Sequence, residues 1–338
     1  MTELPGQSLV ILLPVFNDWE SVRILLPVLD QHLLASGRKA RVLLVDDGST
    51  EEPPAALMQN FLAAIDPVEI LHLRRNLGHQ RAIAIGLYHV QEFLSPRAVV
   101  IMDADGEDRP ADVCALLDEF DNSGGRDVVF AARTKRLESI SFRVSYHLYR
   151  IVHRVLTGIS VRVGNFSVLP ASALTRLMVV SELWNHYAAA VFKARLPCRT
   201  LPLPRGQRFA GGSQMNFASL LVHGLSAISV FSEIVSARLL VAAAIFGVAG
   251  LLLIPAASAF AAGLLLVLVL QAFAFALLFC FLIVSGRSAM NFLPVRDAPY
   301  FILNKTVCPN TSSSLEALHA TLAEDAHEPI PTPSASHR

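Results

Sequence analysis

A long stretch without charged side chains constrains the fold of this chain more than any other feature. No Asp, Glu, Lys or Arg lies between Arg238 and Arg287. As one helix, the stretch would measure about 70 Å at ~1.5 Å per residue, roughly twice the ~30 Å of a bilayer core. Because residues 255–258 (PAAS) supply a natural break, we expect two membrane-spanning helices, near residues 239–254 and 259–284. The alternative is a hairpin buried in the core of a soluble protein.

The basic residues on either side of this stretch predict its orientation. Arg238 precedes it, and three basic residues follow it: Arg287, Arg296 and Lys305. Basic flanks favour the cytoplasmic side, and an even number of spans returns the chain to the side where it began. The short apolar run at residues 9–13 does not have the form of a signal peptide. We therefore expect a multi-pass protein of a bacterial-type inner membrane with its large amino-terminal domain in the cytoplasm.

The composition limits the other classes of protein. The 28 basic and 28 acidic residues balance, which gives no argument for a nucleic-acid partner. The four cysteines lack the spacing of a zinc site or a disulfide framework. We divide the chain into a soluble-type domain at 1–215, an interfacial amphipathic helix at 216–237, two spans within 238–286, and a cytoplasmic tail at 287–338 that is largely disordered after 305.

The first 215 residues alternate apolar runs with segments of helical spacing. Runs at 8–14 and 41–45 have the form of strands buried on both faces, and 19–34 has the spacing of a helix between them. The pattern continues with strands near 68–73, 98–102 and 127–131 and helices near 80–93 and 111–120. It predicts an α/β fold with an open parallel sheet. In such sheets, ligands bind beyond the carboxyl ends of the strands.

Pairs of acidic residues follow two of the predicted strands. Asp103 and Asp105 come directly after one strand, and side-chain alternation would direct both carboxylates to the same side. Two like charges placed in this way favour a hard divalent cation, Mg²⁺ or Mn²⁺, shared with a diphosphate. Asp46 and Asp47 precede Gly48, where an acidic residue can hold a base or a ribose hydroxyl. Each pair taken alone also fits an ordinary turn or helix cap.

Several motifs occur in a fixed order along the chain. They are residues 13–18 (LPVFND), 45–49 (VDDGS), 76–79 (NLGH), 102–110 (MDADGEDRP), Arg133 and residues 208–213 (RFAGGS). Together they resemble family 2 glycosyltransferases of the GT-A type, and in particular the polyprenyl-phosphate glycosyltransferases, which include dolichyl-phosphate mannose synthases. The resemblance covers roughly residues 8–235. It implies a GT-A (Rossmann-like) nucleotide-sugar domain followed by interfacial helices and a two-helix transmembrane hairpin.

The resemblance also implies roles for individual residues. The nucleotide pocket would be lined by Pro14, Phe16, Asp18, Asp46 and Asp47. The metal and diphosphate would be held by Asp103 and Asp105, with Glu107 beside them where relatives usually have Gln. Phosphate groups of the donor or acceptor would meet Arg133, Arg208 and Ser213. The catalytic set would be Asp103, Asp105, Arg133 and Arg208.

Two positions depart from the relatives on the acceptor side. Asn165 stands where relatives usually have Asp, and Gln214 stands where they usually have Lys. We still place Asn165 among the acceptor-binding residues, because a lipid phosphate is largely dianionic at neutral pH and needs positioning rather than a base. An alcohol acceptor would need a base, for which the sequence offers Glu182, His186 and Asp108. Nearby, Trp184 and Tyr187 either cap a substrate pocket or pack a helix.

These expectations combine into one reaction. We expect metal-dependent, inverting transfer of a sugar from a nucleotide-sugar donor to polyprenyl phosphate at the cytoplasmic face of the bilayer, by a protein that can form homo-oligomers. A first alternative keeps the transfer but uses another membrane glycan or lipid-linked acceptor. An alternative of another class is a non-catalytic membrane scaffold that retains the fold.

Overall fold

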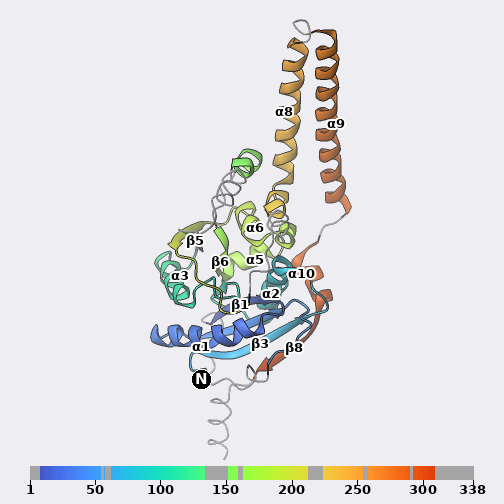
Figure 1. The fold of residues 1–338 in the computed structure, drawn as a ribbon. Helices are drawn as coiled ribbons and strands as arrows, with labels where there is room; N and C mark the ends of the chain where they lie inside the picture. Colours follow the sequence, from blue (N-terminus) through green and yellow to red (C-terminus); the bar gives the residue numbers. More distant parts are fainter. Residues whose placement is uncertain are drawn as a thin grey trace, which may run out of the picture.

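The computed structural model describes residues 8–54, 57, 62–133, 151–158, 163–211, 224–253, 258–289 and 292–308. These residues form an eight-stranded mixed sheet in the order β7-β5-β6-β4-β1-β2-β3-β8 (Figure 1). Its strands are β1 (Leu9–Val15), β2 (Ala40–Asp46), β3 (Ile65–Leu73), β4 (Ala98–Ile101), β5 (Val128–Arg133), β6 (Val163–Pro170), β7 (Cys198–Leu203) and β8 (Ile302–Cys308). The α-helices are α1 (Trp19–Ala35), α2 (His79–Phe93), α3 (Pro110–Asn122), α5 (Ala171–Leu177), α6 (Tyr187–Lys193), α8 (Ser232–Leu253), α9 (Ala259–Ala289) and α10 (Pro294–Asp297), with two 3₁₀ turns, η2 (Ser181–Trp184) and η4 (Ala298–Phe301).

The central strands are apolar on both faces because helices cover both faces of the sheet. In β1, Ile11 and Leu13 pack in a core cluster with α1 and α3. Val10 and Leu12 point to the opposite face and pack with α2. All four side chains are buried, so the continuous apolar run does correspond to a central parallel strand.

The sheet is mixed, which corrects the expectation of a parallel one. Strands β4, β1, β2 and β3 are parallel, as predicted. However, β6 runs antiparallel to β4 and β5, and β8 runs antiparallel to β3. The chain therefore returns to the sheet after the apolar stretch, and residues 306–308, which we assigned to the disordered tail, belong to β8.

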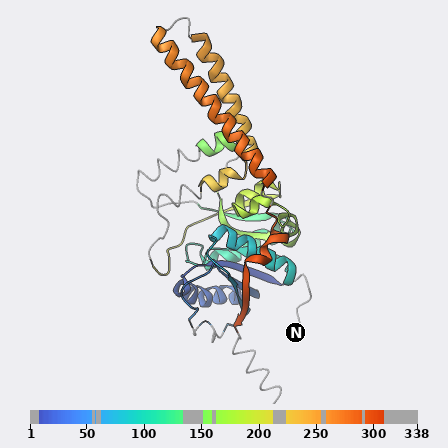
Figure 2. The ribbon, with the colours of Figure 1, turned by 90° about the vertical axis from the view of Figure 1, so that its right-hand side faces the viewer.

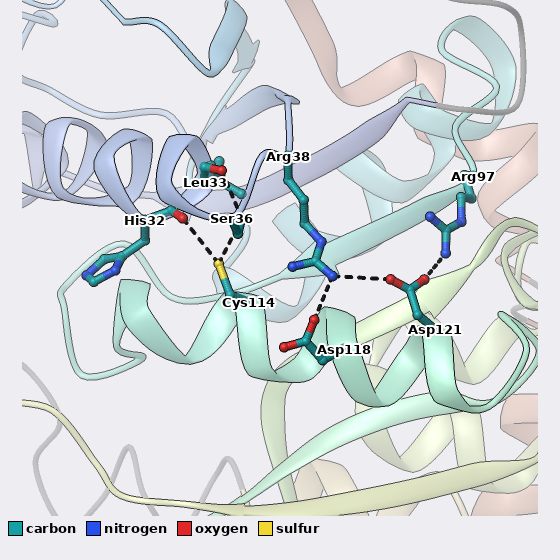
Figure 3. A network of polar contacts seen from close by, with 8 residues as sticks. All are labelled: His32, Leu33, Ser36, Arg38, Arg97, Cys114, Asp118 and Asp121. Atoms are coloured by element: carbon teal, nitrogen blue, oxygen red, sulfur yellow. Dashed lines mark hydrogen bonds and ion pairs between the residues drawn. The ribbon is translucent and has the colours of Figure 1, made fainter.

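Polar contacts fix α1 against α3 on one face of the sheet (Figure 3). Arg38, just after α1, donates hydrogen bonds to Asp118 at 2.7 Å and Asp121 at 3.3 Å, both on α3. The Sγ atom of Cys114 lies 3.5 Å from the carbonyl oxygen of His32. These pairs are partly exposed and each contributes little stability. Their effect is to set the position of α1 relative to α3. Each of these helices begins directly after a loop that carries acidic side chains, so the contacts also help to place those two loops.

Helices α8 and α9 lie side by side and extend away from the sheet (Figures 1 and 2). Both are long and apolar enough to cross a membrane, over Ser232–Ala249 and Ala259–Phe279, and few of their side chains are buried by the rest of the protein. A hairpin of two apolar helices was expected. The first helix begins earlier than predicted, at Ser232, so the end of the expected interfacial helix at 216–237 is the start of α8. Residues 212–223 lie outside the described residues.

Both ends of this hairpin attach to the α/β domain. Before α8, Val230 and Phe231 pack on Ala189 of α6, and Lys193 donates a hydrogen bond to the carbonyl oxygen of Val230 at 3.0 Å. After α9, the ring of Phe292 lies 3.8 Å from that of Trp184, measured between centroids. Trp184 therefore packs the returning chain against η2, in agreement with the packing interpretation of this residue.

Candidate active site

The carboxyl ends of three parallel strands meet at one edge of the sheet. Val15 of β1 lies opposite Asp46 of β2, and Leu12 of β1 lies opposite Ile101 of β4. The loops that leave β1, β2 and β4 consequently lie next to one another. They carry the acidic residues that the sequence singled out.

The loop after β4 holds Asp105 in a partly buried turn. The N–H of Glu107 donates to Oδ1 of Asp105 at 2.9 Å, and Nη1 of Arg208 donates to Oδ2 at 3.0 Å. Burial, with the neighbouring charge of Asp103 as the second cause, raises the pKa of Asp105 to about 6. A raised pKa means that this position holds more negative charge than its surroundings stabilise, which suits a cation.

The segment before Ala210 covers this turn. Phe209 donates its N–H to the carbonyl oxygen of Asp105 at 2.8 Å, and Gly206 donates to that of Glu107 at 2.8 Å. Gly106 has a φ of +88°, and a Cβ there would lie 2.5 Å from the Phe209 ring. The turn thus requires glycine both for its backbone conformation and for space.

Arg208 joins two loops through its side chain. Besides its bond to Asp105, Nη2 pairs with Oδ2 of Asp18, which follows β1, and Nε donates to the carbonyl oxygen of Ala210 at 2.8 Å. The planar guanidinium meets both carboxylates at once, which an ammonium group could not do with the same geometry. The motif led us to expect Arg208 at phosphate groups, and it did not predict the contacts of Arg208 with Asp18 and Asp105.

Glu107 lies beside the aspartates but pairs with a different arginine. Its carboxylate forms an ion pair with Arg205. Sequence reasoning missed Arg205, which lies three residues before the recognised motif and follows no pattern of its own. Asp103 is held from the backbone side, because its N–H donates to Asp108 at 2.9 Å.

The two aspartates after β2 have their oxygens engaged by the protein. The N–H groups of Leu77 and Gly78 both donate to Asp47 at 2.7 Å. Asp47 is only 2% exposed, and burial raises its pKa to about 6. Asp46 accepts from the N–H of Ser49 at 2.9 Å, and its other oxygen lies 2.8 Å from Nδ1 of His72. These contacts show both residues shaping the loops at the expected nucleotide site.

Asn165 lies in a buried polar network. It is 8% exposed, and its Oδ1 accepts a hydrogen bond from Gln80 at 2.9 Å. Gln80 in turn accepts from the N–H of Tyr187 at 2.7 Å, and the Tyr187 hydroxyl lies 2.8 Å from that of Ser167. The network joins α2, β6 and α6. Burial raises the pKa of Tyr187, which packs in the core rather than capping a pocket.

The remaining predicted residues occupy different parts of the edge. Phe16 is 38% exposed, and Pro14 is half-buried at the end of β1. Their position suits contact with a flat base. Arg133 ends β5, on the same sheet. Ser213 and Gln214 lie outside the described residues.

The donor set at this edge fits a divalent cation that is also bound by a phosphate ligand. Among the described residues, no three acidic, histidine or cysteine side chains gather closely enough to hold an ion alone. Mg²⁺ is often held by one or two carboxylates together with substrate phosphates. Asp103 and Asp105 could supply those carboxylates, and Arg208 lies beside them.

An α/β sheet with these acidic loops at its carboxyl edge defines a protein of the GT-A type. The chain belongs to glycosyl transferase family 2, whose family model matches residues 10–184.

Two relatives show how far the similarity extends. An undecaprenyl-phosphate 4-deoxy-4-formamido-L-arabinose transferase from Klebsiella pneumoniae is 32% identical over 145 residues, which are 43% of this chain and 42% of the relative. The match thus spans less than half the length of that transferase. An uncharacterized glycosyltransferase from Bacillus subtilis, YkcC, is 27% identical over 233 residues, 66% of this chain and 68% of the relative.

Solved structures give more distant matches. Mannosyl-3-phosphoglycerate synthase from Rubrobacter xylanophilus has a TM-score of 0.48 at 14% identity, over 68% of this chain and 74% of that one. Glucosyl-3-phosphoglycerate synthase from Mycobacterium tuberculosis, in complex with Mn²⁺, uridine diphosphate and glucosyl-3-phosphoglycerate, has a TM-score of 0.45 at 13% identity, over 68% and 80%.

Proposed function

We propose that this protein transfers a sugar from a nucleotide-sugar donor to a polyprenyl phosphate at the membrane surface, with a divalent cation and with inversion at the sugar carbon. The observation that carries the proposal is the cluster at the carboxyl edge, where Arg208 meets Asp105 and Asp18 beside Asp103. The similarity to an undecaprenyl-phosphate transferase supports the choice of acceptor.

In the proposed reaction, Asp103 and Asp105 would hold Mg²⁺ or Mn²⁺ beside the donor diphosphate. A cation bound there would supply positive charge to the leaving diphosphate. Arg208 would exchange a carboxylate partner for a phosphate oxygen of the donor, which a guanidinium binds with matching geometry. Phe16 and Pro14 would contact the base, and Asp46 and Asp47 shape the loops around it.

The acceptor oxygen attacks the anomeric carbon as the bond to the diphosphate breaks, which inverts that carbon in one displacement. A lipid phosphate is largely dianionic at neutral pH and needs no general base. This agrees with an amide at Asn165, which bonds to Gln80 within the fold. Arg133 and Ser213 remain candidates for contacts with the acceptor phosphate.

The hairpin would bring the lipid to the active site. Both of its ends attach to the same domain, so a bilayer crossed by α8 and α9 has the domain on one side. The basic flanks favour the cytoplasmic side, where nucleotide sugars are available.

The direct test uses the purified full chain in detergent. It is incubated with radiolabelled nucleotide sugars, undecaprenyl or dolichyl phosphate, and Mg²⁺, Mn²⁺ or EDTA, and the lipid is extracted. We expect label in a metal-dependent lipid that mild acid hydrolyses. Donor turnover without labelled lipid would assign another acceptor, and no turnover with any donor would contradict the proposal in favour of a scaffold.

A further inference from the structure

A histidine connects the strand that follows the hairpin to the acidic edge of the sheet. His72 lies on β3, and Thr306 lies on the neighbouring antiparallel strand β8. Nδ1 of His72 lies 2.8 Å from Oδ2 of Asp46, and its Nε2 lies 3.2 Å from the hydroxyl oxygen of Thr306. Residues from three adjacent strands thus form one polar chain.

The chemistry of these groups fixes the direction of one bond. An ionised carboxylate only accepts, so Nδ1 of His72 donates to Asp46. At Nε2, a neutral ring accepts the hydroxyl hydrogen of Thr306, and a protonated ring donates to the hydroxyl oxygen. In either form, the threonine hydroxyl supports the ring orientation in which Nδ1 faces Asp46.

The polar chain continues from Asp46 into the loop after β1. Oδ1 of Asp46 accepts from the N–H of Ser49 at 2.9 Å, and the Ser49 hydroxyl accepts from the N–H of Asn17 at 3.0 Å. Oδ1 of Asn17 then accepts from the N–H groups of Thr50 at 2.9 Å and Glu51 at 3.2 Å. The first bond lies within the turn after β2, and the three bonds that involve Asn17 tie this turn to the loop after β1.

These bonds hold the backbone of Asn17 in a left-handed conformation. Its φ is +50°, a region that few residues with a Cβ adopt, although Asn tolerates it better than most. The next residue is Asp18, whose carboxylate pairs with Arg208. An error in the position of Asn17 would move Asp18 and weaken its hold on that arginine.

We propose that His72 and Thr306 are positioning residues for the donor site. They fix the Asp46 carboxylate, which fixes the Ser49 turn and so holds Asn17 and Asp18 in place. Strand β8, which follows the hairpin in the sequence, would thus help to position loops that follow the first two strands of the domain. The expected change in donor KM rests on the proposed function. The expected loosening of the two loops does not.

The test compares the substitution Thr306→Val with Thr306→Ser and with a matched control, Thr200→Val. Valine keeps the branched shape that suits an edge strand and removes only the hydroxyl. Serine keeps the hydroxyl. Thr200 lies on β7, the edge strand at the other side of the sheet, so its substitution reports any general effect of the change.

Hydrogen exchange of the full chain in detergent, read at short times by mass spectrometry, measures the two loops directly. We expect exchange in peptides covering residues 16–19 and 47–51 to be about fivefold faster in Thr306→Val, the scale of one lost hydrogen bond, and unchanged in Thr306→Ser and Thr200→Val. Equal exchange in Thr306→Val and Thr200→Val, or equally fast exchange in Thr306→Ser, would overturn the proposal.

A double substitution tests whether the groups act along one path. Asp46→Asn leaves one acceptor oxygen where Ser49 and His72 now use two, so one of the two bonds is lost, and the same peptides should loosen. Because residues on one path do not act independently, Asp46→Asn combined with Thr306→Val should exchange no faster than Asp46→Asn alone. If the increases in exchange rate of the two single variants multiply in the double variant, the residues act separately, which would contradict the proposal.

Steady-state kinetics provide the functional reading. We expect Thr306→Val to raise the donor KM about threefold, with the acceptor KM unchanged and with Thr306→Ser close to wild type. A rise in the acceptor KM alone would count against positioning at the donor site. If the wild-type chain transfers no sugar, the proposed function fails, whereas the exchange experiment still decides on the path from Thr306 to Asn17.

Discussion

Nη1 of Arg208 donates a hydrogen bond to Oδ2 of Asp105 at 3.0 Å, although the two residues belong to segments far apart in the chain. The same guanidinium pairs with Asp18, from a third segment. One side chain therefore balances two carboxylates at the edge where strands β1 and β4 end. The stability of this edge and the proposed chemistry depend on the same arginine.

Replacing Arg208 tests that dependence. We expect Arg208→Ala to lower kcat by about 10²–10³-fold, because it removes the guanidinium that holds Asp18 and Asp105 and that would meet the leaving diphosphate in the proposed reaction. Arg208→Lys should recover only part of the loss, since an ammonium group does not reproduce the fork that meets two carboxylates. The control is Arg199→Ala, which removes an arginine that pairs with Asp127 and Glu119 on the surface. Equal losses in the two alanine variants would contradict the assignment.

The raised pKa of Asp105 predicts how metal binding depends on pH. The pKa of the Asp105 carboxyl without a bound metal is about 6. Asp105 therefore becomes protonated as the pH falls below that value, and the proton competes with the cation. We expect Mn²⁺ affinity, measured by electron paramagnetic resonance in the presence of a nucleoside diphosphate, to fall by up to about tenfold per pH unit below 6. Asp112→Asn, which changes an aspartate in the first turn of α3 whose pKa is also raised, should leave this profile unchanged. A flat profile from pH 7 to 5 would refute the assignment.

Asp47 makes a prediction about stability rather than binding. Its pKa is raised by burial to about 6, so the fold favours the neutral form. The contribution of neutral Asp47 to the free energy of unfolding is complete below about pH 4, the usual pKa of an aspartate. It is lost as the pH rises through 6, because the buried carboxyl then ionises. Asp47→Asn cannot ionise, and its melting temperature relative to wild type should therefore increase between pH 4 and 7. A difference that stays constant over this range would show that Asp47 does not titrate as described.

Gly106 tests the packing of the turn after β4. Gly106→Ala places a Cβ 2.5 Å from the Phe209 ring in addition to straining the backbone. Gly124→Ala has a comparable positive φ of +72°, but its Cβ would meet nothing nearer than 3.7 Å. We expect both substitutions to lower the free energy of unfolding by about 1 kcal/mol or more, because both strain the backbone. Only Gly106→Ala should also lose most of its transfer activity. Melting temperatures and transfer rates of the two variants make the comparison.

The central fold could be predicted because burial on two faces leaves a clear pattern. Strands β1, β2 and β4 are continuous apolar runs, and the helices between them have regular apolar spacing. Edge strand β8 has exposed Asn304 and Lys305 among its residues, so it lacks that pattern. Its pairing with β3 depends on the chain returning from the hairpin, which local sequence does not encode.

The same contrast holds for the candidate site. Asp103 and Asp105 were found because they follow a buried strand and match a family motif. The bond between Arg208 and Asp18 joins residues 190 positions apart and could not be found from spacing. His72 was missed because a single histidine within a strand has no pattern that separates a polar link from ordinary packing.

The place of β8 in the chain sets an order for biogenesis. Ribosomes make proteins from the amino terminus, so both hairpin helices emerge before Thr306 and its strand. Until then β3 is an open sheet edge, the kind of surface on which nascent chains aggregate. If the hairpin inserts into a bilayer as it is made, the last strand pairs with β3 after that insertion. The sheet would then be completed at the membrane.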